Sequence, residues 1–234
     1  MTKGRISTSL ALLVMTAGAA HAAGRPVQLR ASDGVAIAAT VYDAATTPAP
    51  AVVLVHMLTR AKEDWRPLAE RLQAAGMTAL ALDLRGHGQS EGSAAPAAVM
   101  ALDVHAAVSW LAGRSEVVPG AIAAVGASIG ASLVLLTAAD VPSVRGVALL
   151  SPASDYRGVR MDAALKKYGS RPLLLVASGE DPYAMRTVRA MAGADQTARE
   201  QRISAVAAHG SLLVDRDPDV ASALVDWLRR TLLF

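Results

Sequence analysis

Five short stretches of the chain are almost entirely apolar and show no regular alternation with polar residues. Continuous apolar runs of this length are typical of strands that are buried on both faces of a sheet. They cover residues 51–55, 77–82, 121–125, 144–150 and 172–177.

The segments between these runs predict helices. In the segment 63–76, Trp65, Leu68 and Leu72 share one helical face, and Gly76 ends the helix. Further helices are expected at 96–113, 129–139, 161–168, 183–192 and 218–233, and a short strand at 203–207.

Two β-rich runs near the start, 27–31 and 35–42, flank a Ser32-Asp33-Gly34 turn and predict a hairpin. Strands that alternate with helices are joined by right-handed crossovers and form a mostly parallel sheet. We therefore predict an α/β fold, with a mostly parallel twisted sheet, an N-terminal β-hairpin and helices on both faces. Ligands of such sheets bind beyond the carboxyl ends of the strands, so the loops after the strands form the candidate site.

The first 22 residues have the pattern of a bacterial signal peptide. The charges of Lys3 and Arg5 precede an uncharged stretch, and Ala20 and Ala22 provide the small residues of a cleavage site. The apolar run is shorter than the ~20 residues of a membrane span, although an uncleaved anchor is the alternative interpretation. We predict removal of residues 1–22 and a single domain over 23–234, periplasmic or secreted, with no stable membrane anchor.

Composition narrows the possible partners. The formal charge is +3, but Lys3 and Arg5 would leave with the signal peptide, so the mature chain carries 21 basic and 20 acidic residues. There is no cluster of Lys and Arg with interleaved aromatic residues, which argues against nucleic-acid binding. The absence of cysteine excludes a disulfide framework, a thiolate zinc site and a cysteine nucleophile.

A Gly-x-Ser-x-Gly sequence, formed by Gly126, Ser128 and Gly130, follows the strand 121–125 and precedes a helix. Glycines two residues to either side leave space for a sharp turn, which lifts the serine hydroxyl above the sheet at the positive end of the helix. This context predicts a nucleophilic serine. The alternative is a turn of small residues that merely begins a helix.

An acid and a histidine follow two later strands. Asp181 comes after the strand 172–177 and is expected to orient an imidazole, with Glu180 as the competing acid and a helix N-cap as the alternative role. His209 follows the last predicted strand. The chain order Ser128, Asp181, His209 is that of the nucleophile-elbow fold, and a neutral imidazole can accept a hydroxyl proton and return it later.

The loop after 51–55 reads His56, Met57, Leu58 and Thr59. Its backbone N–H groups, together with that of Ile129, are candidates for an oxyanion hole. We expect His56 to have a structural role. The same is expected of His87, in a self-bonded loop over 83–90, and of His105, within a helix.

Five motifs in order resemble the α/β-hydrolase superfamily over essentially the whole mature chain, and small serine esterases and dienelactone hydrolases look nearest. The motifs cover residues 52–56, 81–90, 126–130, 178–181 and 208–210. The resemblance implies Ser128 as nucleophile, Asp181 as acid and His209 as base, with the N–H groups of Ile129 and Leu58 as the oxyanion hole. In this superfamily a glycine usually follows the histidine of the first loop, whereas this chain has Met57, which restricts the backbone there and is expected to line the pocket.

The function implied is hydrolysis of ester-like acyl bonds of small substrates through an acyl-enzyme. No metal or organic cofactor is needed. Asp181 lies only 53 positions after Ser128, which leaves room for a minimal cap and favours small or surface-accessible acyl groups. The alternatives are a peptidase, amidase or acyltransferase with the same triad, or an exported binding protein with this fold and no turnover.

Overall fold

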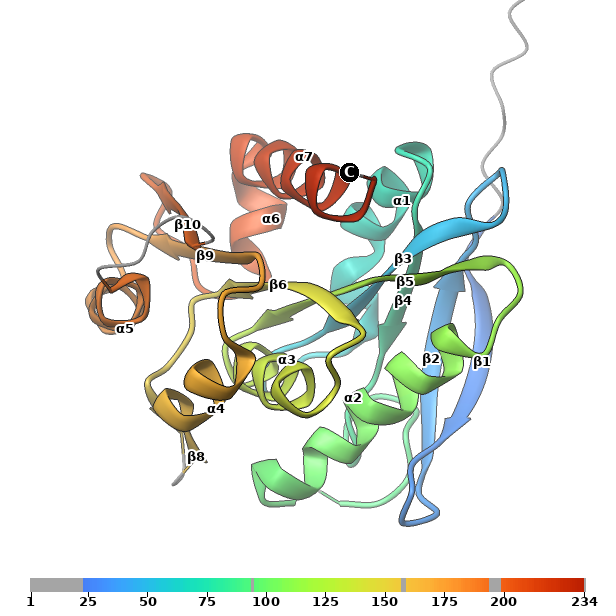
Figure 1. The fold of residues 1–234 in the computed structure, drawn as a ribbon. Coiled ribbons are helices and arrows are strands. Elements are labelled where there is room, and N and C mark those ends of the chain that lie inside the picture. The colour runs from blue at the N-terminus through green and yellow to red at the C-terminus, as the bar shows by residue number, and fades with distance from the viewer. Residues whose placement is uncertain (1–22, 94, 157–158, 194–198, 234) are drawn as a thin grey trace, which may run out of the picture.

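The computed structural model describes residues 23–93, 95–156, 159–193 and 199–233 (Figure 1). The proposed signal peptide lies outside these residues. The strands are β1 (Arg25–Arg30), β2 (Ala36–Tyr42), β3 (Ala49–Val55), β4 (Thr78–Leu82), β5 (Val117–Ala127), β6 (Val144–Leu150), β7 (Asp155–Tyr156), β8 (Val159–Arg160), β9 (Leu173–Ser178) and β10 (Arg199–Ser204). The helices are the 3-10 turn η1 (Lys62–Trp65) and α1 (Arg66–Ala74), α2 (Ala97–Ala112), α3 (Ile129–Asp140), α4 (Met161–Tyr168), α5 (Pro182–Ala192), α6 (Leu212–Arg216) and α7 (Pro218–Leu233).

Eight strands form one sheet in the order β1-β2-β4-β3-β5-β6-β9-β10. The pairs from β4 to β10 are all parallel, whereas β2 is antiparallel to both β1 and β4. The predicted fold class is therefore confirmed, with an N-terminal hairpin joined to a mostly parallel sheet.

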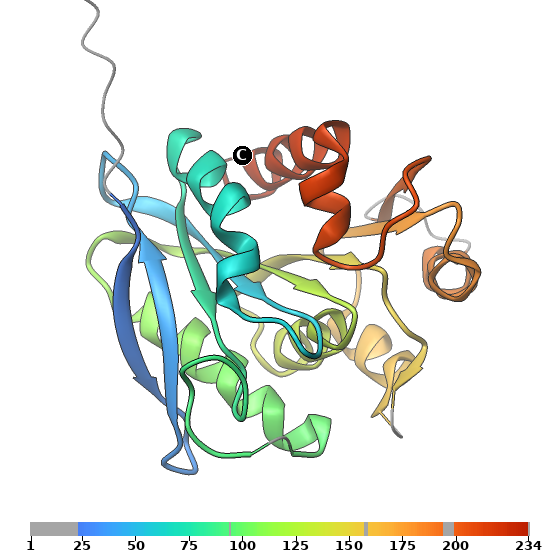
Figure 2. The ribbon, with the colours of Figure 1, turned by 180° about the vertical axis from the view of Figure 1, so that it is seen from behind.

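Helices cover both faces of the sheet, so its central strands have no solvent face (Figures 1 and 2). Along β3, Val53 and Val55 pack in the layer of α2 and α3, while Val52 and Leu54 pack in the layer of α1 and α7. All four side chains are fully buried. This double burial is the physical reason for the continuous apolar runs in the sequence.

The predicted position of the last strand was wrong. The strand expected at 203–207 is β10, Arg199–Ser204, and the chain after Ser204 is no longer extended. β10 is an edge strand with mostly exposed side chains, so it has no apolar run that could mark it. The helix expected at 63–76 begins with η1 before α1, and the short hairpin of β7 and β8 and the helix α6 were not predicted.

A largely buried ionic cluster fastens the turn of the N-terminal hairpin to the loop after β4 and to α2. The guanidinium of Arg85, only 4% exposed, contacts the carboxylates of Asp33 (2.5 Å) and Asp103 (2.7 Å). Asp33 lies in the hairpin turn and Asp103 lies in α2, where it is completely buried. A buried carboxylate is costly unless a cation compensates it, so Arg85 is required where it lies. None of the helices in the described ranges is both long and apolar enough to cross a bilayer.

Candidate active site

Ser128 occupies the tight turn between β5 and α3. Its backbone has φ 52° and ψ −113°, a conformation that costs a non-glycine residue of order 1–3 kcal/mol. The N–H of Ser128 donates to the carbonyl of Leu150 at 2.9 Å, which anchors the turn to the end of β6. A Cβ on Gly126 would collide with the carbonyl oxygen of Gly130, and one on Gly130 would lie 2.7 Å from the carbonyl oxygen of His56. Both glycines are therefore needed for the backbone to approach this closely.

The helix α3 begins immediately after Ser128, and Ile129 is its first residue. The first N–H groups of a helix have no acceptor within the helix, and the N-terminus carries a partial positive charge. The N–H of Ile129 is thus a donor next to Ser128 that suits a negatively charged oxygen.

His209 and Asp181 are joined directly. Nδ1 of His209 lies 2.6 Å from Oδ2 of Asp181, although the two residues are 28 positions apart. The His209 side chain is 48% exposed and that of Asp181 only 16%, so a shielded carboxylate holds an accessible imidazole. The contact fixes the ring and leaves Nε2 for another partner.

The two carboxylate oxygens of Asp181 have different partners. While Oδ2 contacts His209, Oδ1 accepts a hydrogen bond from the N–H of Ala184 (3.0 Å) and caps α5. Burial alone would raise the pKa of Asp181, but these two hydrogen bonds outweigh it and hold the pKa below its usual 3.8. The neighbouring Glu180 is exposed, and the carboxylate that contacts the imidazole is Asp181 and not Glu180.

His56 holds the loop after β3. The imidazole is completely buried, and its Nε2 accepts a hydrogen bond from the N–H of Leu84 (2.9 Å). Nδ1 therefore carries the proton and donates to the carbonyl of Met57 (2.7 Å). Burial lowers the pKa of His56 despite this bond, so the ring is neutral. The carbonyl of Met57 and the N–H of Leu58 belong to one trans peptide and point to opposite sides. The hydrogen bond from His56 therefore directs the Leu58 N–H away from the imidazole. Within the described ranges this N–H has no acceptor.

Three of the loops meet at Gly210, the residue after His209. Gly210 has φ 60°, and a Cβ there would lie 2.5 Å from Sδ of Met57 and 3.4 Å from Cβ of Ala127. Met57 belongs to the loop after β3, and Ala127 precedes Ser128. The structure thus brings the loop of His209 close to the turn of Ser128, with the Met57 side chain next to Gly210.

The structure does not join Ser128 to His209 directly: within the described residues the two side chains form no hydrogen bond. Their loops nevertheless lie close together, since a Cβ on Gly210 would lie 3.4 Å from Cβ of Ala127. Hydrogen bonds between catalytic groups are often long without substrate and shorten in the reacting complex.

The loop over 83–90 is structural, as the sequence suggested. The buried carboxylate of Asp83 accepts hydrogen bonds from the backbone N–H of Lys62 (2.8 Å), from Nζ of Lys62 (2.7 Å) and from the backbone N–H of Gln89 (2.9 Å). A Cβ on Gly88 would collide with this carboxylate. His87 lies in this loop, and its Nδ1 is 3.1 Å from the carbonyl oxygen of Arg85. This contact stays within the loop and does not involve His209.

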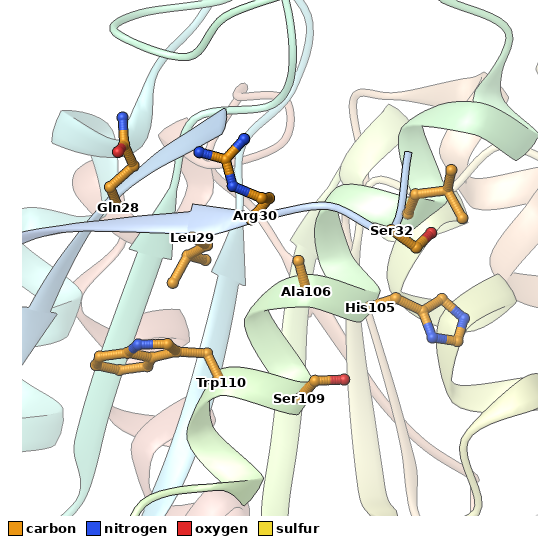
Figure 3. Close-up of a pocket in the computed structure, with 9 residues that line it drawn as sticks. Gln28, Leu29, Arg30, Ser32, His105, Ala106, Ser109 and Trp110 are labelled. Carbon is orange, nitrogen blue, oxygen red and sulfur yellow. The ribbon is translucent and has the colours of Figure 1, made fainter. Parts of the chain in front are cut away.

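Open hollows flank these loops. One of about 420 Å³ next to the Leu58 loop is lined by Thr59 and His87, and one of about 560 Å³ next to the Asp181 loop is lined by Gly179 and Pro182. A further groove of about 550 Å³ lies elsewhere, between β1 and α2 (Figure 3). Leu29 points into it, and His105, Ser109 and Trp110 line its helical side. No residue of the site described above lines that groove.

The family of the chain follows from comparison with known proteins. Residues 46–177 match the family described as serine aminopeptidase, S33. The chain belongs to this family and to the α/β-hydrolase superfamily. The match includes Ser128, while Asp181 and His209 lie beyond it, so the contact between those two is evidence from the structure alone.

Among curated proteins, an uncharacterized protein of Mycobacterium tuberculosis is 31% identical over 130 residues. These residues are 55% of this chain and 46% of the relative, so the chain spans about half the length of the curated relative that it matches.

Solved structures share the fold at low sequence identity. An esterase of Pyrococcus furiosus superimposes with a TM-score of 0.75 at 18% identity, covering 89% of this chain and 91% of the esterase. A dienelactone hydrolase of Anabaena variabilis gives a TM-score of 0.71 at 20% identity, with 89% and 98% of the two chains covered. The α/β hydrolase GrgF of a Penicillium species gives a TM-score of 0.75 at 16% identity, with 90% and 99% covered.

Proposed function

We propose that this hydrolase cleaves ester-like acyl bonds of small substrates with Ser128 as the nucleophile, His209 as the base and Asp181 as the acid of a triad. The observation that carries the proposal is the 2.6 Å contact between His209 and Asp181, on a loop that packs against the turn of Ser128. An imidazole held in this way has one nitrogen fixed by a carboxylate and the other available for proton transfer.

In the proposed reaction, Nε2 of His209 accepts the proton of the Ser128 hydroxyl while Oγ attacks the substrate carbonyl. The N–H groups of Ile129 and Leu58 donate to the oxygen that becomes negatively charged. The imidazolium then gives its proton to the leaving alcohol. A water molecule attacks the acyl-enzyme by the same route, which restores the Ser128 hydroxyl and releases the acid.

The site favours small or surface-accessible acyl groups. The imidazole of His209 is half exposed, which supports access of a substrate from the surface. Among the described residues, the segment between β6 and β9 adds only the β7–β8 hairpin and the eight-residue helix α4, which supports a minimal cap.

Amide cleavage is a second candidate, favoured by the description of the family as serine aminopeptidases. The same triad would serve an amide, so the substrate and not the catalytic residues distinguishes the two.

Export is a further part of the proposal: removal of residues 1–22 would leave a periplasmic or secreted enzyme. Expression of the full chain and mass measurement of the exported protein tests this, with a mature N-terminus at Ala23 expected.

The function is tested with the mature protein on p-nitrophenyl esters of graded acyl length and on amino-acid p-nitroanilides. We expect the short esters to be turned over fastest, and Ser128→Ala to abolish this turnover. Faster turnover of the anilides would replace the esterase assignment with the aminopeptidase one. No turnover of either class by a folded protein would favour a binding function.

A further inference from the structure

The end of β6 forms hydrogen bonds with the two segments that carry Ser128 and His209. The carbonyl of Leu150 accepts the hydrogen bond from the N–H of Ser128, at 2.9 Å. The next residue, Ser151, accepts a hydrogen bond with its Oγ from the N–H of Gly210, at 3.0 Å. Two consecutive residues thus hold the turn that carries the nucleophile and the loop that carries the base His209.

Ser151 is held firmly in an unfavourable backbone conformation. Its N–H donates to the carbonyl of Val176 at 2.7 Å, which continues the ladder between β6 and β9, and its φ is 48°. A positive φ costs a serine of order 1 kcal/mol relative to glycine, which reaches this region freely. The residue is only 2% exposed, so its hydroxyl lies inside the protein. A glycine would fit this backbone better but would lack the hydroxyl.

The carbonyl of Gly210 accepts a hydrogen bond from the N–H of Leu213 (3.2 Å), but among the described residues the Gly210 N–H donates to the Ser151 hydroxyl. Gly210 is buried and pressed against Met57 and Ala127, so water does not replace a missing acceptor for its N–H without movement. An unpaired buried N–H costs about 1–3 kcal/mol. Without the Ser151 hydroxyl, the loop is therefore expected to shift so that this N–H finds another acceptor, and His209 would shift with it.

We propose that Ser151 is a positioning residue, whose hydroxyl holds the main chain beside His209 in register with the turn of Ser128. Asp181 fixes the imidazole ring, and Ser151 fixes the backbone from which the ring projects. The inference rests on the proposed function, because it assigns Ser151 to the same reaction without any contact to the substrate.

The test uses Ser151→Gly and Ser151→Ala in the mature protein. Both variants remove the hydroxyl, but only glycine also relieves the backbone strain, so Ser151→Gly is expected to melt at a higher temperature than Ser151→Ala. Both are expected to lose about 10- to 100-fold in kcat on a short p-nitrophenyl ester, since a displacement of about 1 Å costs about 10²-fold. KM should change little. Because His209 acts in acylation and in deacylation, the rate of fluorophosphonate labelling should fall by a similar factor.

Ser132→Ala is the matched control. Its hydroxyl is also buried, at 1% exposure, but has no partner within the described residues, so its removal should leave kcat unchanged. Rates are normalised to the fraction of molecules that fluorophosphonate finally labels, so that unfolded chains do not contribute.

Wild-type kcat in Ser151→Gly, with Ser128→Ala inactive, would overturn the role of Ser151 and leave the proposed function intact. A raised KM at unchanged kcat would also overturn it, because it would indicate substrate binding rather than positioning of the base. Turnover by Ser128→Ala would remove the proposed function, and the role of Ser151 with it.

Discussion

The close approach of α3 to the loop after β3 leads to a quantitative prediction for Gly130→Ala. The new Cβ would lie 2.7 Å from the carbonyl oxygen of His56, and closer still to that of Val55, whereas ordinary contact begins at 3.4 Å. The two segments must therefore separate by about 0.7 Å or more. They carry the two proposed oxyanion donors, the N–H groups of Ile129 and Leu58.

A substrate oxygen could then be held well by only one of the two donors. Loss of one such donor costs about 10²–10³ in kcat, so we expect Gly130→Ala to lower kcat by about 10²-fold. Crowding in a packed region also lowers the free energy of unfolding by about 1–3 kcal/mol. The assay is ester hydrolysis at a temperature at which circular dichroism shows the variant to be folded.

Gly113→Ala is the control for adding a methyl group. A Cβ on Gly113 would lie 3.5 Å from the nearest atom, the carbonyl oxygen of Ser109, and its φ of −83° suits any residue. We expect no change in kcat. A folded Gly130→Ala variant with kcat within about threefold of wild type would contradict the placement of the donors on these two segments.

Three further predictions concern charged groups. Asp181→Asn should lower kcat by about 10⁴-fold and Glu180→Gln should leave it unchanged, as measured by ester hydrolysis; the reverse order would move the acid to Glu180. Because the folded-state pKa of Asp181 is lowered, its contribution to stability is present above pH 3.8 and lost as the pH falls through the folded pKa. Between pH 7 and pH 2 the melting temperature should therefore fall less in Asp181→Asn than in wild type. Arg85→Met would leave the buried carboxylate of Asp103 uncompensated and should lower the free energy of unfolding by about 3–5 kcal/mol in urea titrations, whereas an unchanged midpoint would refute this account of the hairpin.

The interior of the sheet was predictable from the sequence, because strands covered on both faces must be apolar throughout. β10 was misplaced because it lies at the edge and exposes polar side chains. The turn at Ser128 was also predictable from the local sequence, since the positions of its two glycines follow from the sterics of a single turn.

No local pattern in the sequence specifies the contacts between the loops. Glu180 and Asp181 are adjacent carboxylates after the same strand, and only the structure shows that Asp181 contacts His209. The role of Ser151 depends on Gly210, which is 59 residues away, and on a backbone angle that no sequence pattern specifies. A serine at the end of a strand has no other sequence feature that would indicate this role.

The central claim is that Ser128 is an activated nucleophile, and the most direct measurement is covalent labelling of the mature protein with a fluorophosphonate. We expect the intact mass to rise by one probe adduct, peptide mapping to place the adduct on Ser128, and Ser128→Ala to remain unlabelled while folded. An unreactive wild-type protein, or an adduct that persists in Ser128→Ala, would contradict the account.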